Sequence, residues 1–339
     1  MINIGIIGYG YWGPNLVRNF NETTGINVCQ VSDLDPNKLR KVKARYPGID
    51  VNTDAKEIIE NQKVDAIAIA TPVSTHYDLA LKALKMGKHV LVEKPMADTS
   101  EKCQELIELA ERKKLILMVD HTFPYTGAVN KIKDLIETRE LGKILYYDSV
   151  RINLGLFQHD INVIWDLAVH DLSILDFLFD EKPVAVSATG MAHVSDQPEN
   201  VAYLTLFYDD NLIAHIHVNW LSPVKIRQTL IGGDKKMLVY DDLEPTEKVK
   251  IYDKGIDMVS NDKSIYNLRV GYRTGDMWAP NLDNSEALFN LTNHFRECIL
   301  QNERPITNAM SGLQVVRMME AATRSMSNNG QSEKLDKDY

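Results

Sequence analysis

Cysteine is scarce in this sequence, with only Cys29, Cys103 and Cys298 among 339 residues. The three lie far apart, and none belongs to a C-x-x-C pair. Such an odd and dispersed set of thiols predicts neither a disulfide framework nor a zinc site. We therefore expect a protein without disulfides and without a bound metal.

Long hydrophobic runs are also missing. The longest, such as residues 66–70 and 115–119, are far shorter than the roughly 20 residues that a helix needs to cross a bilayer. The chain opens on an apolar run at residues 2–7, with no basic leader and no cleavage site of a secretory signal. We expect a soluble, cytoplasmic protein that does not bind membranes.

Positive charge is in the minority, because 38 Lys and Arg against 47 Asp and Glu leave a net charge of −9. Nucleic acids and anionic bilayers would repel such a surface, so we expect neither as a partner. A phosphate-bearing small molecule would need backbone N–H groups or cations gathered at one place. The composition is otherwise that of a globular protein, and the length suggests about two domains.

Up to residue 121, short runs rich in Val and Ile alternate with segments of helical period. The runs are mostly apolar on both faces, as buried parallel strands are. They are residues 2–7, 27–32, 64–70, 89–92 and 115–119. This alternation predicts a doubly wound parallel sheet, so we assign residues 1–121 to an α/β nucleotide-binding domain of the Rossmann type.

The pattern changes after residue 122, where apolar segments follow one another with turn signals between them. We expect strands at residues 144–153, 184–194, 201–208, 212–220, 226–231 and 236–240. We expect helices near residues 128–138, 163–179, 286–301 and 312–327, and a long loop with short strands at 241–282. Residues 122–339 thus read as an α+β domain with a large, mostly antiparallel open sheet that binds substrate and joins subunits.

A glycine-rich motif, Gly8-Tyr9-Gly10-Tyr11-Trp12-Gly13, follows the first run and precedes a segment with Pro14 in its first turn. In this position Gly8 allows a tight turn and Gly10 lets a pyrophosphate approach the backbone. Gly13 lets a helix pack closely on the strand. All six residues are candidate cofactor-binding residues, and the helix N-terminus would supply the N–H donors.

Asp33 follows Gly13 by 20 residues and ends the second run, where a carboxylate accepts hydrogen bonds from the ribose of a dinucleotide. The same charge would repel a 2′-phosphate, so NAD(H) is favoured over NADP(H). Lys38 and Arg40 nearby keep NADP(H) open. The structural alternative is a glycine-rich turn and a surface Asp that caps a helix at Pro36.

Lys94, in Glu93-Lys94-Pro95, stands directly after the run 89–92, at the edge of a parallel sheet where ligands bind. Burial or a neighbouring cation would lower the pKa of this amine, which suits a proton donor or relay. The alternative is a solvated lysine in a loop.

Asp166 and His170 are four residues apart on a predicted helix and so share a face. A carboxylate beside an imidazole fixes its tautomer and raises its basicity, which suits the histidine to accept a hydroxyl proton. A surface pair on an amphipathic helix is the alternative. Arg151 and Asn153 share one face of the preceding strand, where they could bind a sugar hydroxyl, carboxylate or phosphate or be solvated.

Two further histidine signals are weaker. His215 and His217 alternate on one predicted strand, but the sequence identifies no third ligand, so a sheet-face pair is favoured over a metal site. His159 and Asp160, ahead of the Asp166 helix, could contact substrate or end a loop.

Together these motifs resemble the glucose–fructose oxidoreductase, inositol dehydrogenase and MocA superfamily of NAD(P)-dependent dehydrogenases. The resemblance covers essentially the whole chain. Besides the glycine motif, it rests on Asp33-Leu34-Asp35-Pro36, Ala70-Thr71-Pro72 with His76, Glu93-Lys94-Pro95, and Asp166 with His170.

The resemblance implies that Lys94, Asp166 and His170 form a catalytic group above the nicotinamide. It also implies a set of cofactor contacts, with one near the nicotinamide ribose. The lining residues would be Thr71, Pro72 and His76, and the ribose contact would be Glu93.

Two features depart from the family pattern. Asn162-Val163-Ile164-Trp165 stand where relatives often have glycines, and Asp171 follows His170 directly where relatives often have an Asp three residues later. Substrate contacts that relatives make through those positions cannot be transferred to this chain.

Three segments resemble the branch of the family that acts on sugar nucleotides, such as UDP-N-acetylglucosamine or N-acetylglucosaminuronate 3-dehydrogenases and deoxysugar 3-ketoreductases. They are His121-Thr122-Phe123-Pro124-Tyr125, residues 165–175, and Tyr272-Arg273-Thr274-Gly275-Asp276 followed by Pro280. The candidate substrate contacts are His121, Tyr125, Arg151, Asn153, Asn162 and His170.

We therefore expect an NAD-dependent oxidoreductase acting on a secondary hydroxyl or ketone, at C3, of a nucleotide-linked sugar such as a UDP-N-acetylhexosamine or its uronate. One alternative is a polyol, inositol or free-aldose dehydrogenase. Another is an NAD-sensing regulatory protein, which should have lost Lys94 or the Asp166–His170 pair, although all three are present. We expect a homo-oligomer, dimer or tetramer, formed through the open sheet.

Overall fold

The computed structural model describes residues 1–155, 161–253, 255–258 and 270–335. By packing, the chain divides into two units. Unit 1 comprises Met1–Thr126 and Asn284–Glu320, and unit 2 comprises Gly127–Asp283 and Ala321–Tyr339. This division differs from the predicted domains, 1–121 and 122–339, because a C-terminal stretch of the chain packs with unit 1.

Unit 1 contains a six-stranded sheet in which every neighbouring pair is parallel. Its order is β3-β2-β1-β4-β5-β6, the doubly wound order of dinucleotide-binding folds. The strands are β1 (Ile2–Ile7), β2 (Ile26–Ser32), β3 (Asp50–Asn52), β4 (Ala66–Ile69), β5 (His89–Glu93) and β6 (Leu117–Asp120). The predicted parallel sheet is confirmed.

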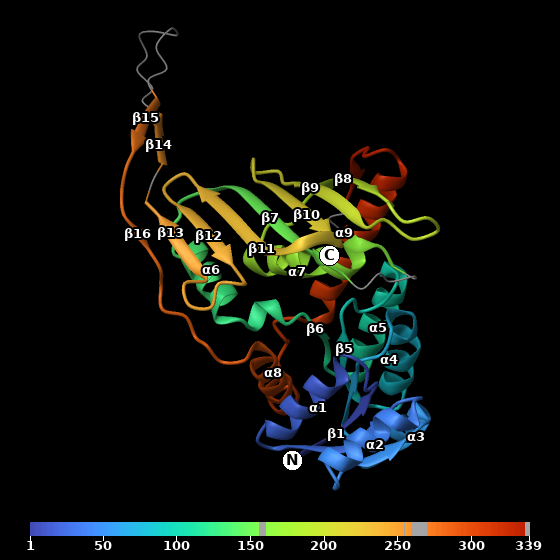
Figure 1. Cartoon of the computed structure of the whole chain (residues 1–339). Coiled ribbons are helices and arrows are strands. Elements are labelled where there is room, and N and C mark those ends of the chain that lie inside the picture. The colour runs from blue at the N-terminus through green and yellow to red at the C-terminus, as the bar shows by residue number, and fades with distance from the viewer. Residues whose placement is uncertain (156–160, 254, 259–269, 336–339) are drawn as a thin grey trace. The chain divides into compact units, whose positions relative to one another are not determined.

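Helices connect these strands, as the alternating pattern predicts. They are α1 (Gly13–Glu22), α2 (Pro36–Arg45), α3 (Ala55–Glu60), α4 (His76–Lys85) and α5 (Ser100–Lys113), with a short 3₁₀ turn η1 (Val73–Thr75). Pro14 lies in the first turn of α1, whose apolar face buries Leu16, Val17 and Phe20. Helices α4 and α5 lie side by side (Figure 1).

The remainder of unit 1 comes from the far end of the sequence. A second 3₁₀ turn, η2 (Phe123–Tyr125), is followed much later by α8 (Ala287–Gln301) and by the part of α9 (Ala309–Ser327) that precedes Ala321. Phe295 of α8 meets Phe20 of α1 edge-on, with ring centroids 6.2 Å apart. The Thr292 and Thr23 hydroxyls are 2.9 Å apart and buried. These contacts explain why α8 packs with the nucleotide-binding sheet.

Unit 2 contains a nine-stranded sheet in the order β16-β13-β12-β11-β7-β10-β9-β8-β17, in which β7 and β10 pair in parallel and the other pairs are antiparallel. Its strands are β7 (Ile144–Leu154), β8 (Ala185–Met191), β9 (Val201–Phe207), β10 (Ile213–Asn219), β11 (Leu221–Gly233), β12 (Met237–Asp241), β13 (Val249–Tyr252), β16 (Met277–Trp278) and β17 (Glu333–Lys334). The predicted mostly antiparallel sheet is confirmed.

The helices of unit 2 cover one face of this sheet. Helix α6 (Gly127–Glu137) lies beside α7 (Val169–Leu178) on the same side of the sheet (Figure 1). A π-helical turn, η3 (Ile164–Ala168), runs directly into α7. The predicted helix over 163–179 therefore exists, but its first turn is wider than an α-helical turn, a feature that often marks functional sites.

The region 241–282 contains short strands, as predicted. Besides β13 and β16, it contains β14 (Gly255–Met258) and β15 (Val270–Arg273), which pair in antiparallel orientation. None of the helices in the described part of the chain is long and apolar enough to cross a bilayer.

The two faces of the unit 2 sheet differ in character. On the helix-covered face, Tyr147 and Arg151 of β7 are buried. On the other face, Tyr203 stacks on His217 with ring centroids 4.4 Å apart, and His215 lies 6.4 Å from the same ring. The two histidines thus form the predicted sheet-face pair, and the described residues include no group of three or more His, Cys, Asp or Glu placed to hold a metal ion.

Candidate active site

The glycine motif forms the loop between β1 and α1. Gly8 has φ +99°, and a Cβ there would lie 2.4 Å from the Ala70 carbonyl oxygen. A Cβ on Gly13 would lie 2.3 Å from the Gly8 carbonyl oxygen, whereas a Cβ on Gly10 would meet nothing within 4 Å. The three glycines therefore differ: two are required by close packing, and the third faces open space. That space, beside a helix N-terminus, fits the pyrophosphate of a dinucleotide.

Asp33 is tied to the glycine loop. Its Oδ2 accepts a hydrogen bond from the Tyr9 amide at 2.7 Å, and its Oδ1 accepts one from the Asp35 amide at 2.9 Å. Lys38 Nζ lies 3.3 Å from Oδ2. A carboxylate accepts about four hydrogen bonds, so Asp33 keeps capacity for ribose hydroxyls. The N-cap of α2 is Asp35, which accepts from the Asn37 amide, so Asp33 is not the surface cap of the structural alternative.

Trp12 links the glycine loop to the end of β6. Its Nε1 donates a hydrogen bond to Asp120 Oδ2 at 2.8 Å, while Thr122 Oγ1 donates to Oδ1 at 3.0 Å. Asp120 is buried. Sequence reasoning missed Asp120, although an acidic residue that closes an apolar run is a recognisable signal.

Glu93 lies opposite Asp120 in the register of β5 and β6. Burial raises the pKa of Glu93 well above its usual value, and the charge of Asp120 and a hydrogen bond with it raise this pKa further. Two carboxyl groups buried side by side cannot both ionise cheaply, so Glu93 favours its protonated form. Its Oε2 accepts a hydrogen bond from the Lys94 amide at 3.2 Å.

Lys94 and His121 follow neighbouring parallel strands, so both stand at the carboxyl edge of the unit 1 sheet. His121 is 1% exposed, and neither of its ring nitrogens has a hydrogen-bond partner among the described residues. Burial, and then the charge of Lys94, lowers the pKa of His121 to about 3. His121 is therefore neutral at physiological pH.

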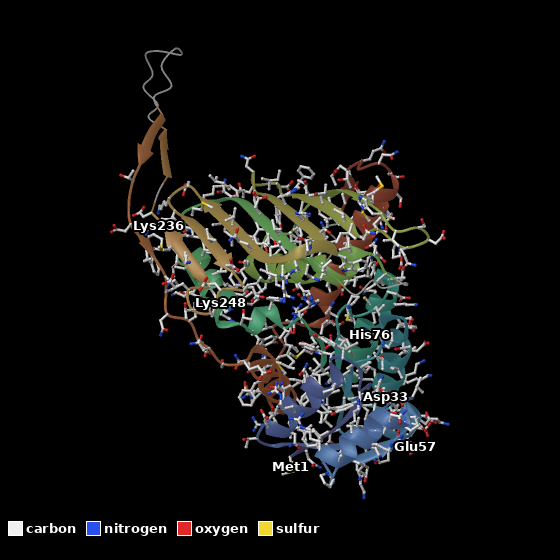
Figure 2. All side chains as sticks on the ribbon, viewed as in Figure 1. Met1, Asp33, Glu57, His76, Lys236 and Lys248 are labelled. Atoms are coloured by element: carbon white, nitrogen blue, oxygen red, sulfur yellow. The ribbon has the colours of Figure 1, made fainter. Side chains whose placement is uncertain are left out.

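His76 joins two turns at the same edge. Its Nδ1 lies 2.8 Å from the Pro95 carbonyl oxygen and its Nε2 lies 2.8 Å from the Thr71 carbonyl oxygen. Burial lowers the pKa of His76 more than these two carbonyl groups raise it. Asp33 and His76, both labelled in Figure 2, belong to unit 1. The buried His76 ring thus fixes the turn of Thr71 and Pro72, both predicted to line the cofactor, relative to Pro95.

Tyr125 lies in the interior of unit 1. Its hydroxyl is 3.0 Å from Nδ1 of His294 and 3.4 Å from Oγ1 of Thr307, and burial raises its pKa. The structure therefore places this predicted substrate contact against α8. Tyr11, in contrast, is exposed.

Asp166 and His170 lie on η3 and on the first turn of α7, respectively. Asp166 Oδ2 accepts a hydrogen bond from Nε1 of the buried Trp220 at 2.9 Å. Asn162, a predicted substrate contact, is buried, and its Oδ1 accepts a hydrogen bond from the Ile164 amide at 3.1 Å. Its side chain thus caps the turn that carries Asp166.

Arg151 points into the helix-covered face of the sheet. Its Nε lies 2.6 Å from Asp171 Oδ2, and its Nη2 donates to Oδ1 at 3.2 Å. The side chains of Arg151 and Asp171 are 4% and 1% exposed. Asn153, on the same face of β7, is half-buried. His159 and Asp160 lie outside the described residues.

Two family models match the chain. Residues 2–121 match the model described as an oxidoreductase family with an NAD-binding Rossmann fold. Residues 129–239 match the GFO/IDH/MocA C-terminal domain. Together the matched stretches include most of the described chain.

The individual relatives share only modest sequence identity with this chain. A 1-carboxy-3-chloro-3,4-dihydroxycyclohexa-1,5-diene dehydrogenase of Comamonas testosteroni is 30% identical over 224 residues, which are 63% of this chain and 56% of that protein. The match thus spans little more than half of that relative. The scyllo-inositol 2-dehydrogenase (NAD(+)) of Bacillus subtilis (strain 168) is 24% identical over an alignment of 351 positions, which includes 99% of this chain and 95% of that protein.

A solved structure shares the fold. The UDP-N-acetylglucosamine 3-dehydrogenase of Acidithiobacillus ferrooxidans superposes with a TM-score of 0.81 and 23% identity, over 97% of this chain and 99% of that one. The sheet orders, the glycine loop and the two family matches all indicate the same family. The chain belongs to the GFO/IDH/MocA family of oxidoreductases, with an NAD-binding Rossmann fold in unit 1.

Proposed function

We propose that the protein is an NAD(H)-dependent dehydrogenase or reductase that interconverts a secondary hydroxyl and a ketone on a sugar. The observation that carries this proposal is the loop after β1, where Gly10 faces open space at the N-terminus of α1 and Asp33 is held beside the loop. Lys94 follows another strand of the same parallel sheet and so stands at the same edge. Such a reaction requires a loop that binds the cofactor and a group beside it that acts on the reacting oxygen, which is the part we propose for Lys94.

The chain's own groups divide the work as follows. When bound, the nicotinamide dinucleotide takes a hydride from the substrate carbon or returns it. The amides around Gly10 and the first turn of α1 hold its phosphates, and Asp33 accepts its ribose hydroxyls. The proposed cofactor environment is completed by the other predicted cofactor residues, namely Tyr9, Tyr11, Trp12, Thr71, Pro72, His76 and Glu93.

On the substrate, we assign the proton transfer to His170 and the polarisation of the reacting oxygen to Lys94. During oxidation His170 takes the hydroxyl proton, and Lys94 stabilises the negative charge that develops on the oxygen and relays the proton. Asp166, held by the Trp220 Nε1 group at 2.9 Å, orients the imidazole and stabilises the positive charge that the ring gains when it takes the hydroxyl proton. His121 and the half-buried Asn153 are the substrate contacts that we retain.

NAD(H) is the proposed cofactor because of Asp33. Its carboxylate would lie beside the site of a 2′-phosphate and repel it. Lys38 already forms an ion pair with that carboxylate, with its Nζ 3.3 Å from Asp33 Oδ2. The charge balance at this position therefore favours the unphosphorylated dinucleotide.

We propose a nucleotide-linked sugar, oxidised or reduced at C3, as the substrate. The support is the resemblance of the segment 121–125 and of the Asp166 helix to the sugar-nucleotide branch. The second candidate is a polyol such as an inositol, which the full-length match to a scyllo-inositol 2-dehydrogenase favours. An NAD-sensing protein without catalysis is a third reading, disfavoured because Lys94, Asp166 and His170 are all present.

The test is a turnover assay with NAD+ and NADP+ against UDP- and dTDP-sugars, inositols and free aldoses, followed by absorbance of the reduced cofactor at 340 nm. NMR of the product identifies the oxidised carbon. We expect Lys94→Ala and His170→Ala to abolish turnover while NADH binding survives, and Lys102→Ala, at a surface ion pair, to behave as wild type. Near-normal turnover by both site variants would refute the mechanism.

We also propose a homo-oligomer, dimer or tetramer, that covers the open face of the unit 2 sheet with a second copy of the chain. Ile213 and Phe207 are paired in register on neighbouring strands, and with Tyr203 they leave about 40% of their surface exposed. Adjacent apolar side chains of this size are typical of surfaces buried on association. Sedimentation at the monomer mass would contradict this proposal.

A further inference from the structure

We propose that the buried Asp171–Arg151 ion pair is a positioning device for His170. The inference rests on the proposed function in one respect, namely that His170 is the residue that exchanges a proton with the substrate. Asp171 is its direct neighbour on the first turn of α7. Whatever fixes the Asp171 side chain therefore fixes the rotation of the turn that presents His170.

Asp171 is held at both oxygens. Arg151 Nε contacts Oδ2 at 2.6 Å, and Oδ1 receives Arg151 Nη2 at 3.2 Å and Ser149 Oγ at 2.6 Å. A guanidinium that meets a carboxylate with two nitrogens restricts its orientation as well as its position. Ser149 and Arg151 lie on the central strand β7, so the sheet itself holds the first turn of α7.

The turn before α7 explains why such an anchor is needed. Asp166 lies in the π-helical turn η3, and His170 lies after the change to α-helical geometry. Across this change, regular helix geometry alone does not determine how the two side chains face each other. Two side chains supply fixed points instead: Trp220, between β10 and β11, holds Asp166, and Arg151 of β7 holds Asp171.

A purely structural role for the ion pair makes a different prediction. Replacing a buried ion pair by apolar residues of similar volume is often neutral or stabilising, whereas removing one partner leaves an unpaired buried charge. The double variant Arg151→Met/Asp171→Leu should therefore recover the thermal stability that Arg151→Met alone loses. If the pair only supports the fold, activity should recover with it.

We expect activity to stay low. The double variant should melt close to the wild type, yet its kcat should fall by about 100-fold with little change in KM, because a small misplacement of a reacting group costs about this much. Arg151→Lys, which keeps the charge but loses the two-nitrogen contact, should fold and show a smaller loss of kcat. Asp176→Asn is the matched control, because Asp176 is on the same helix and pairs with Lys182 at 2.7 Å. It should lower the melting temperature without lowering kcat.

A measurement without substrate separates this inference from the proposed function. In protein labelled with ¹⁵N-histidine, the His170 ring signals are identified by their loss in His170→Gln. We expect one neutral tautomer in the wild type and a mixture in the double variant. A mixture in the wild type, or an unchanged single tautomer together with wild-type kcat in the double variant, would overturn the inference. If the wild type turns over none of the substrates, the proposed function fails, and the tautomer result alone decides the role of the ion pair.

Discussion

Acidification should destabilise unit 1, and the buried His121 should account for a measurable part of the loss. His121 is 1% exposed, and its ring nitrogens have no hydrogen-bond partner among the described residues. Burial and the charge of Lys94 lower its pKa from 6.5 to about 3. As the pH falls below 6.5, the unfolded chain binds a proton that the folded chain excludes, so stability present at neutral pH is lost.

The magnitude follows from the linkage between proton binding and folding. As the pH falls from 6.5 to about 3, the free energy of unfolding decreases by about 1.36 kcal/mol for each pH unit. At about pH 4.5, two units below the unfolded pKa, the loss is roughly 2.7 kcal/mol. This is a large part of the 5–15 kcal/mol that typically stabilises a domain, so it is measurable.

The comparison is between the wild type and His121→Phe, which keeps an aromatic ring at the site without the titrating nitrogens. Each protein is unfolded with urea at about pH 7.5 and about pH 4.5, and the unfolding of unit 1 is followed by pulsed hydrogen exchange of peptides from β6. Other histidines whose pKa burial lowers, such as His76 and His89, are present in both proteins, so their effects cancel.

We expect the wild type to lose roughly 2.7 kcal/mol more than the variant between the two pH values. Equal losses would show that His121 protonates in the folded state without penalty. The reasoning from its burial would then be wrong.

Three further predictions concern single residues. Gly10→Ala should leave the melting temperature unchanged but weaken NADH binding by about tenfold or more, because the added Cβ would enter the space assigned to the pyrophosphate. The control Gly13→Ala should fail to fold normally, because its Cβ would lie 2.3 Å from a carbonyl oxygen. Asp33→Ser should raise the NADP+/NAD+ ratio of kcat/KM by roughly tenfold, measured in parallel assays, and an unchanged ratio would refute its role. Cys103 and Cys298 should resist iodoacetamide at pH 8 in the folded protein, because both thiols are buried and burial raises the pKa of Cys298 to about 11; rapid labelling detected by mass spectrometry would contradict this.

Much of unit 1 could be predicted because its signals are local. A strand such as β1 is apolar on both faces, and the turn after it needs glycine at fixed offsets, so sequence pattern and geometry agree. The strand β3 was missed, since it is only three residues long (Asp50–Asn52), its single apolar residue lies between two polar ones, and none of the three is fully buried. The packing of α8 against α1 could not be predicted either, because the Phe20–Phe295 contact joins segments far apart in the sequence.

Partners within the candidate site were harder to predict than the site itself. The alternation along β7 correctly places Arg151 and Asn153 on one face, but the sequence does not say that helices cover that face. Arg151 therefore looks like a surface cation until α7 brings Asp171 against it. The Trp12–Asp120 hydrogen bond depends in the same way on a contact between segments far apart in the sequence, namely the loop after β1 and the end of β6.

Perturbed titratable groups gather at one edge of the unit 1 sheet, and their location carries functional weight. Burial drives Glu93 toward its protonated form and His121 toward its neutral form, and both flank the position of Lys94. Burying ionisable groups in their neutral forms is costly to the fold, and folds tend to tolerate it where ligands bind. The same edge holds the open side of the glycine loop. Because a neutral His121 adds no second cation beside Lys94, the proposed reaction would rely on Lys94 to stabilise the negative charge that develops on the substrate oxygen at this edge.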